Sequence, residues 1–121
     1  MPAMKQMRKI AIVQTAVGSL PGAKELAGLI IGKRLGACVQ IARIKSAYRW
    51  QGKVESAGEF LLSIKTTLSS ASKAAGFIKK HHPYQLPEII IMSAAASREY
   101  AGWVRKETGS ATSHRMQVKR L

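Results

Sequence analysis

The chain has 121 residues, of which 46% are apolar, so it suits one globular domain and excludes a disordered chain. Its 20 Lys and Arg against 6 acids, all glutamate, give a formal net charge of +14, which favours anionic partners. The basic residues are dispersed, which suits a generally cationic surface better than a nucleic-acid arm. One cysteine excludes an intramolecular disulfide, and no stretch approaches the roughly 18 apolar residues of a membrane span. We therefore expect a cytoplasmic protein.

The first predicted elements are a strand and a helix. Residues 10–13 form a short apolar run of the kind found in buried strands. Gly18, Pro21 and Gly22 then interrupt the chain. From Ala23 onward, apolar residues recur at helical spacing, which predicts a helix with one apolar face. Gly36 is its predicted C-terminal cap.

Two long strands are predicted next, on either side of a Gln51-Gly52 turn. Val39 and Ile41 share one parity, but the apolar residues from Ile44 to Trp50 share the other, so we expect a bulge near residues 42–43. The return strand covers residues 53–66, and its buried face carries Phe60, Leu62 and Ile64. Arms this long exceed the usual five or six residues and would project beyond one small domain. A partner subunit is their simplest cover.

The second half of the chain predicts a helix, a strand and a final helix. Pro83 ends a helix over residues 71–82, a second buried strand follows at residues 89–92, and Ser97 caps the last helix. The order βαββαβ followed by a helix predicts an α+β, ferredoxin-like sandwich. We predict a basic N-terminal segment over residues 1–8, a single domain over residues 9–108 and a basic mobile tail over residues 109–121.

Several ordered, correctly spaced segments resemble the CutA divalent-cation-tolerance family over about residues 9–108. They are RLGACV at 34–39, SAYRWQGKVE at 46–55, Glu59 with LSIKT at 62–66, HPYQLPEII at 82–90, and Tyr100 with Trp103. The resemblance implies a homotrimer joined through the long hairpins. It also implies a link to tolerance of copper and other divalent cations, by sequestration or by signalling similar to that of the PII proteins. The scarcity of acids, the absence of a thiol from residues 14–16 and the extra basic tail depart from the family pattern.

Copper prefers imidazole and thiolate donors, and the chain offers four: Cys38, His81, His82 and His114. Their spacing includes neither CxxC nor HxxxH. We predict that Cys38 and His82 bind Cu(II) or another divalent cation weakly. The alternative makes Cys38 a buried small hydrophobe and places both His81 and His82 at a helix C-terminus, where imidazolium interacts well with the helix dipole.

Two further groups of residues are candidates for binding. Tyr48 and Trp50, near the hairpin tip, are predicted to anchor the trimer interface, because aromatic side chains bury much area at low entropic cost. Packing within one subunit is the alternative. Four residues are predicted to line a ligand cleft between subunits: Glu59, Lys65, Tyr84 and Glu88. The alternative is that they belong to an ordinary salt-bridge network.

Catalysis has little support in the sequence, which lacks a Gly-rich phosphate loop, a GxSxG motif and any Asp for a Ser-His-Asp triad. We expect a trimeric copper-tolerance protein that is not an enzyme, does not insert into membranes, and binds metal or a small ligand between subunits. The alternative is a basic trimeric module for nucleic acid or for acidic or membrane-protein partners. Phosphate-driven binding collapses as salt rises, whereas copper coordination does not, so salt dependence separates the two.

Overall fold

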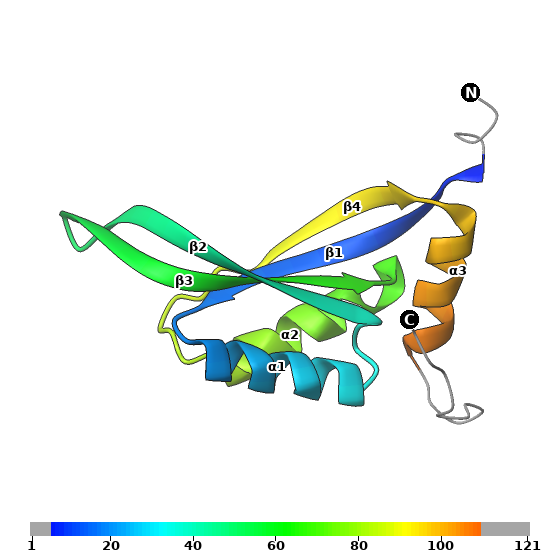
Figure 1. The fold of residues 1–121 in the computed structure, drawn as a ribbon, viewed down its shortest axis with the longest axis horizontal. Coiled ribbons are helices and arrows are strands. Elements are labelled where there is room, and N and C mark those ends of the chain that lie inside the picture. The colour runs from blue at the N-terminus through cyan, green and yellow to red at the C-terminus, as the bar shows by residue number, and fades with distance from the viewer. Residues whose placement is uncertain (1–5, 110–121) are drawn as a thin grey trace.

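The computed structural model describes residues 6–109, and this part of the chain forms a four-stranded antiparallel sheet with three α-helices (Figure 1). The elements are β1 (Arg8–Val17), α1 (Leu20–Gly32), β2 (Cys38–Trp50), β3 (Lys53–Thr66), the 3₁₀ turn η2 (Leu68–Ser70), α2 (Ala71–His81), β4 (Ile90–Ala96) and α3 (Arg98–Glu107). The strand order is β2-β3-β1-β4, with α1 and α2 on one face. This arrangement confirms the predicted ferredoxin-like fold.

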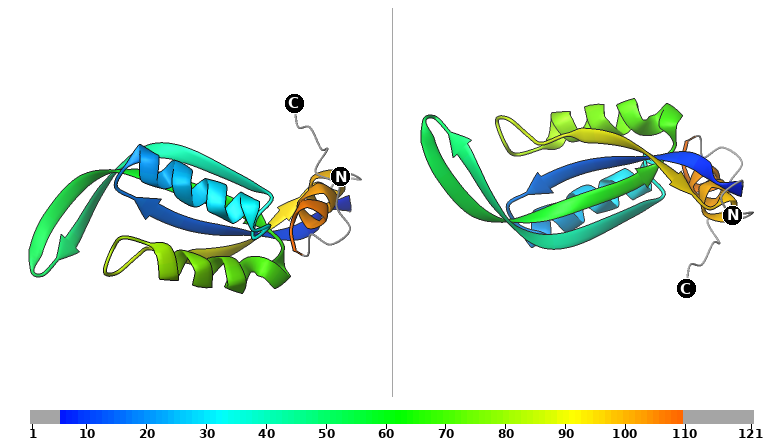
Figure 2. Two further views of the ribbon diagram at one scale, coloured as in Figure 1. Left: turned by 90° about the horizontal axis from the view of Figure 1, so that it is seen from below. Right: turned by 90° about the horizontal axis from the view of Figure 1, so that it is seen from above.

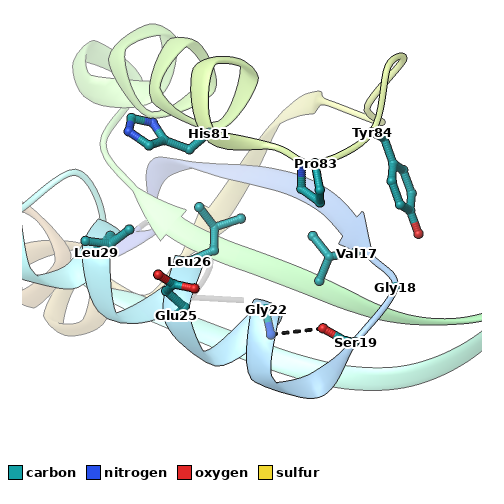
Figure 3. Close-up of a pocket in the computed structure, with 10 residues that line it drawn as sticks. All are labelled: Val17, Gly18, Ser19, Gly22, Glu25, Leu26, Leu29, His81, Pro83 and Tyr84. Carbon is teal, nitrogen blue, oxygen red and sulfur yellow. Dashed lines mark hydrogen bonds between the residues drawn. The ribbon is translucent and has the colours of Figure 1, made fainter.

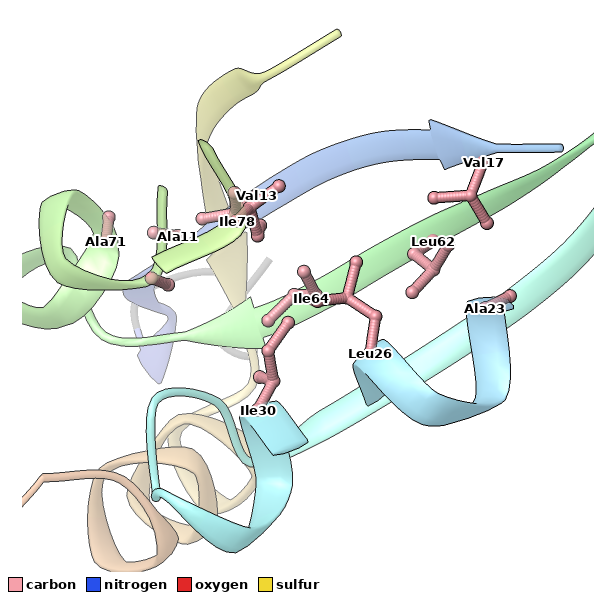
Figure 4. Close-up of a cluster of buried hydrophobic side chains, with 11 residues drawn as sticks. Ala11, Val13, Val17, Ala23, Leu26, Ile30, Leu62, Ile64, Ala71 and Ile78 are labelled. Carbon is pink, nitrogen blue, oxygen red and sulfur yellow. The ribbon is translucent and has the colours of Figure 1, made fainter. Parts of the chain in front are cut away.

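The main core lies between α1, α2 and the face of the sheet that they cover (Figure 4). Its largest fully buried side chains include Val13 from β1, Leu62 and Ile64 from β3, Ile30 from α1 and Ile78 from α2. Burial of each such side chain contributes about 2 kcal/mol of transfer free energy. The predicted apolar face of residues 60–64 is therefore the face that holds the helices to the sheet.

The bounds of α1 differ from the prediction at both ends. The helix begins at Leu20, because the Ser19 side chain accepts a hydrogen bond from the Gly22 N–H at 3.1 Å and Pro21 is tolerated in a first turn. Gly36 is not its cap, since the helix ends at Gly32 and Arg34 takes the left-handed conformation at φ 57°. Gly36 is needed for space instead: a Cβ there would lie 2.6 Å from Cγ2 of Ile64.

The β2–β3 hairpin is continuous. Its register runs without interruption from Cys38 opposite Lys65 to Trp50 opposite Lys53, so the predicted bulge near residues 42–43 is wrong. The apolar residues change parity because the hairpin extends past the helices (Figure 2), and its outer half has no helix-covered core face to fill. Gln51 and Gly52 have φ values of 51° and 80°, which confirms the predicted two-residue turn.

The predicted strand at residues 89–92 is present as β4, but its predicted burial is wrong for a single subunit. β4 is an edge strand, and Ile90, Ile91 and Met92 expose 43%, 47% and 38% of their surface. The helix α3 begins at its predicted cap, Ser97, and its apolar cluster reaches only the far end of β4, at Ala94 and Ala96. The outer face of the sheet is therefore largely uncovered.

The predictions for the N-terminal residues 1–5 and for the tail beyond Gly109 lie outside the described residues. Within residues 6–109, no helix has both the length and the apolar character needed to cross a membrane.

Candidate functional site

The loop between α2 and β4 is tied to the sheet by His82. Its Nε2 lies 2.8 Å from the carbonyl oxygen of Ala16, and its Nδ1 lies 3.0 Å from the backbone nitrogen of Tyr84. A carbonyl only accepts and an amide N–H only donates, so the ring is the neutral Nε2–H tautomer. Both ring nitrogens are thus occupied, and His82 has no lone pair left for a metal ion in this arrangement.

Tyr84 passes the end of β1 and reaches a buried carboxylate. Its hydroxyl donates a hydrogen bond of 2.9 Å to Oε2 of Glu59, which is only 9% exposed. Gly18 permits this path, because a Cβ there would lie 3.1 Å from the Tyr84 hydroxyl oxygen. Burial of the phenol, followed by the hydrogen bond and charge of Glu59, raises the pKa of Tyr84 to about 12. Tyr84 is therefore a neutral donor throughout the physiological range.

Glu88 ties the other end of the same loop to β1. Its Oε2 accepts a hydrogen bond of 3.0 Å from Nε2 of Gln14. Gln14 lies opposite Ser63 of β3, four residues along the strand from Glu59, a separation of about 13 Å. The two carboxylates therefore hold the same loop at two separate points and do not form a close pair.

The structure does not bring all the predicted cleft residues together within one subunit. Lys65 lies six residues from Glu59 on β3, about 20 Å along the strand, and its ammonium group donates to the side-chain oxygen of Gln40. Cys38 stands directly opposite Lys65, at the end of the sheet away from the His82 loop. The predicted metal ligands Cys38 and His82 are therefore apart in one chain.

Metal-ligating side chains do not cluster in the part of the chain that the structure describes. No group of three or more His, Cys, Asp or Glu residues within residues 6–109 could hold a metal ion. Together with the occupied ring of His82, this means that the described donors of a single subunit do not fit a resident metal centre. Any site built from Cys38 and His82 would have to draw on more than one subunit.

A hollow of about 530 Å³ lies on the helix side of the same loop (Figure 3). Its walls include the apolar side chains of Val17, Leu26 and Leu29, with Tyr84 at one side. The polar side chains besides Tyr84 are Glu25, His81 and Ser19, whose hydroxyl oxygen accepts the hydrogen bond from the Gly22 N–H. The His81 Nδ1 lies 3.0 Å from the Phe77 carbonyl oxygen, so in the neutral ring Nε2 is left as an acceptor.

This pocket has the size and the mostly apolar lining that are typical of small-molecule sites. Its carboxylate and imidazole acceptors would suit a small ligand with an apolar body and a donor or cationic group. The sequence prediction missed Glu25. The available signal was that Glu25 is the only acid in α1 of a very basic chain.

The outer face of the sheet carries the predicted interface aromatics. We define the open face as the exposed or half-exposed apolar residues on the side of the sheet away from α1 and α2. They are Ile12, Ile44, Tyr48, Trp50, Leu61, Ile90 and Met92. Tyr48 and Trp50 are 45% and 37% exposed, so neither is packed into the core of its own subunit.

Comparison with known proteins shows a consistent likeness. Residues 11–107 match the family model described as CutA1 divalent ion tolerance protein. The divalent-cation tolerance protein CutA of Thermus thermophilus is 40% identical over 100 residues, covering 81% of this chain and 97% of that protein. Protein CutA of Homo sapiens is 40% identical over 90 residues, covering 73% of this chain and 50% of the human protein.

Solved structures show the same likeness at the level of the fold. The structure of CutA from Synechococcus elongatus has a TM-score of 0.80 and 32% identity, covering 84% of this chain and 91% of that chain. The divalent cation tolerance protein of Thermus thermophilus has a TM-score of 0.78 and 38% identity, covering 84% of this chain and 100% of that chain.

Proposed function

The chain belongs to the CutA1 divalent ion tolerance family, and we propose that it is a cytoplasmic homotrimer that acts in the tolerance of copper and other divalent cations. Its role is binding without catalysis, in clefts between subunits. The bound metal or small ligand is either sequestered or sensed, the latter in a PII-like signalling role.

The open face is the single observation that carries the proposed assembly. Ile12, Ile90 and Met92 form an apolar patch on the sheet, and Tyr48 and Trp50 expose aromatic side chains on the same face of the hairpin. A contiguous apolar patch on a soluble protein marks an interaction surface. A second and third copy of the chain are the proposed cover, because the hairpin reaches past its own subunit and would carry its aromatics onto a neighbour.

Assembly would also bring together the candidate ligand groups that one subunit keeps apart. Glu59 and Tyr84 lie toward the end of the sheet from which the hairpin projects, Lys65 and Cys38 lie at the other end, and Glu88 is held between them by Gln14, which lies opposite Ser63. A cleft that holds all of them needs two subunits. Its carboxylates and ammonium group would select a ligand with both donor and acceptor groups.

Copper would bind weakly under this proposal. His82 becomes a ligand only if it loses its hydrogen bond to Ala16 or to Tyr84, which reduces the net affinity. The thiol of Cys38 is the softer donor and the better match to copper. We therefore propose Cys38 as the main ligand and His82 as the auxiliary one.

Native mass spectrometry with and without Cu(II), at moderate salt, tests assembly and binding together. We expect a trimer that takes up copper in multiples of three, with lower uptake in Cys38→Ser and the least uptake in Cys38→Ser/His82→Ala. Equal uptake by the double variant and the parent would remove both residues from the proposal. A monomer would remove the trimer itself.

A further inference from the structure

The projecting half of the β2–β3 hairpin places three of its four basic residues on one face, while the fourth, Lys53, lies opposite Trp50 on the open face. Arg43, Lys45 and Arg49 share the parity of Val39 and Ile41 on β2, which is the helix-covered face of the sheet, and the hairpin extends past the helices (Figure 2). The two acids of the hairpin, Glu55 and Glu59, lie on the open face, opposite Tyr48 and Ile44. We call the side with Arg43, Lys45 and Arg49 the basic ribbon.

The three charges of the basic ribbon are accessible. All three residues are exposed, and none of them forms an ion pair with another residue in the range 6–109. The residues facing Lys45 and Ala47 across the hairpin are the small Gly58 and Ser56. Arg43 makes a cation–π contact with Phe60: the guanidinium carbon of Arg43 lies 5.9 Å from the centroid of the Phe60 ring.

The structure points to a binding surface for the backbone of single-stranded nucleic acid, and we propose that the basic ribbon is that surface. Arg43 and Lys45 are two residues apart on the strand, about 6.7 Å, which is close to the phosphate repeat of an extended single strand. Ala47 takes the next position on this face, so Arg49 lies about 13 Å from Lys45, about two such repeats. Binding would be electrostatic and independent of base sequence.

An acidic protein fits this surface less well. Protein interfaces need an apolar core with buried anchor residues, and the ribbon face offers small side chains with a lone exposed apolar residue, Val54, beside Arg49. The formal charge of +14 per chain adds a long-range attraction for polyanions. The inference rests on the hairpin alone, so it holds or fails independently of copper binding.

Fluorescence anisotropy with a short labelled single-stranded oligonucleotide at low salt tests the proposal. The ribbon variant is Arg43→Gln/Lys45→Gln/Arg49→Gln. The matched control, Lys73→Gln/Lys79→Gln/Lys80→Gln, removes the same charge from exposed positions on α2. We expect the ribbon variant to bind at least about tenfold more weakly and the control within about threefold of the parent. The salt slope of the ribbon variant should be smaller by about 2, because three single-strand phosphate contacts are lost.

Three results would overturn the proposal. They are the absence of oligonucleotide binding by the parent at low salt, equal weakening in the two variants, and stronger competition by a duplex or by polyglutamate than by unlabelled single strands. Circular dichroism and native mass spectrometry establish that each variant keeps its fold and assembly. If Arg43→Gln disturbs the packing on Phe60, the doubles Lys45→Gln/Arg49→Gln and Lys79→Gln/Lys80→Gln give the same comparison.

Discussion

At the scale of single residues, Arg34 shows why a non-glycine residue can occupy the left-handed backbone conformation. Its left-handed backbone, at φ 57°, costs a non-glycine residue roughly 1 kcal/mol. Its guanidinium, in a residue only 6% exposed, donates to the carbonyl oxygens of Lys106 at 2.7 Å and Gly109 at 3.3 Å. The first bond satisfies a carbonyl in the last turn of α3, where a positive charge is favourable, and the second holds the residue that follows the cap of the helix.

We expect Arg34→Gly to destabilise the protein by about 2 kcal/mol, since relief of the backbone strain is smaller than the loss of two charge-assisted hydrogen bonds. Urea unfolding followed by circular dichroism measures this. Lys73→Ala, an exposed substitution on α2 that also removes a positive charge, should stay within about 0.5 kcal/mol of the parent. A neutral or stabilising Arg34→Gly would show that the contact with α3 contributes little.

The hydrogen bond between Tyr84 and Glu59 predicts how the stability of the protein depends on pH. Its pKa is raised from 10.0 to about 12, first by burial and then by Glu59. The folded state therefore favours the neutral phenol. The contribution of this phenol to the free energy of unfolding is complete below pH 10 and is lost as the pH rises toward 12. Absorbance titration of the chain's three tyrosines should show one late phenol that is absent in Tyr84→Phe.

Glu59→Gln should lower the pKa of Tyr84 toward 10, because the negative charge that opposes ionisation is removed. Glu55→Gln serves as the control, since Glu55 is another acid of the same hairpin but makes no hydrogen bond to Tyr84. If all three phenols ionise together near pH 10 in the parent, the contact between Tyr84 and Glu59 does not exist in solution.

At the scale of elements, the hairpin presents two chemically different sides. The register is uninterrupted over the 13 residues of β2, so parity alone assigns each side chain to the open face or to the basic ribbon. Trp50 lies on the open face, and Val54, which is 73% exposed, lies near it on the other side. Substitutions of Trp50 and of Val54 therefore change the two proposed interfaces separately, although both residues lie near one hairpin tip.

We expect Trp50→Ala to weaken the trimer at least about tenfold, because buried aromatic anchors carry a large share of interface energy. Sedimentation analysis over a dilution series down to nanomolar protein measures the change. Val54→Ala removes an exposed apolar side chain from the opposite side and should leave the trimer unchanged. An intact Trp50→Ala trimer at nanomolar concentration would place the interface elsewhere.

At the scale of the whole molecule, charge opposes the proposed assembly. Each subunit carries a formal +14, so three subunits repel one another while the apolar open face draws them together. Only one ion pair, Arg34 with Glu107 at 3.9 Å, occurs among residues 6–109. Exposed charges interact over about 10 Å at 0.1 M ionic strength and less at higher salt.

We therefore expect added salt to tighten the trimer, because screening weakens the repulsion and leaves apolar burial in place. The subunit dissociation constant, measured by sedimentation in low and in physiological salt, should fall several-fold. A trimer that loosens as salt rises would mean that ion pairs between subunits hold it. This would favour the salt-bridge interpretation of Glu59 and Glu88.

The sequence by itself determined the features that depend on residues close together in the chain. The Gln51-Gly52 turn, the end of α2 before Pro83 and the Ser97 cap follow from local backbone preferences and side-chain hydrogen bonds, and all three are present. The order of the elements and the ordered motifs were also sufficient to predict the ferredoxin-like fold and the family.

Only the tertiary structure decided which distant residues meet. It separates Lys65 from Tyr84, joins Tyr84 to Glu59 across Gly18, and places Glu25 and His81 around one pocket. It also shows that the hairpin is uninterrupted. In the sequence, a change in the parity of the apolar residues can mean either a bulge or a change in which face of the strand is covered. Only the position of the helices distinguishes these two cases. Contacts between residues far apart in the chain depend on how whole elements pack, and that information is not contained in the spacing of neighbouring residues.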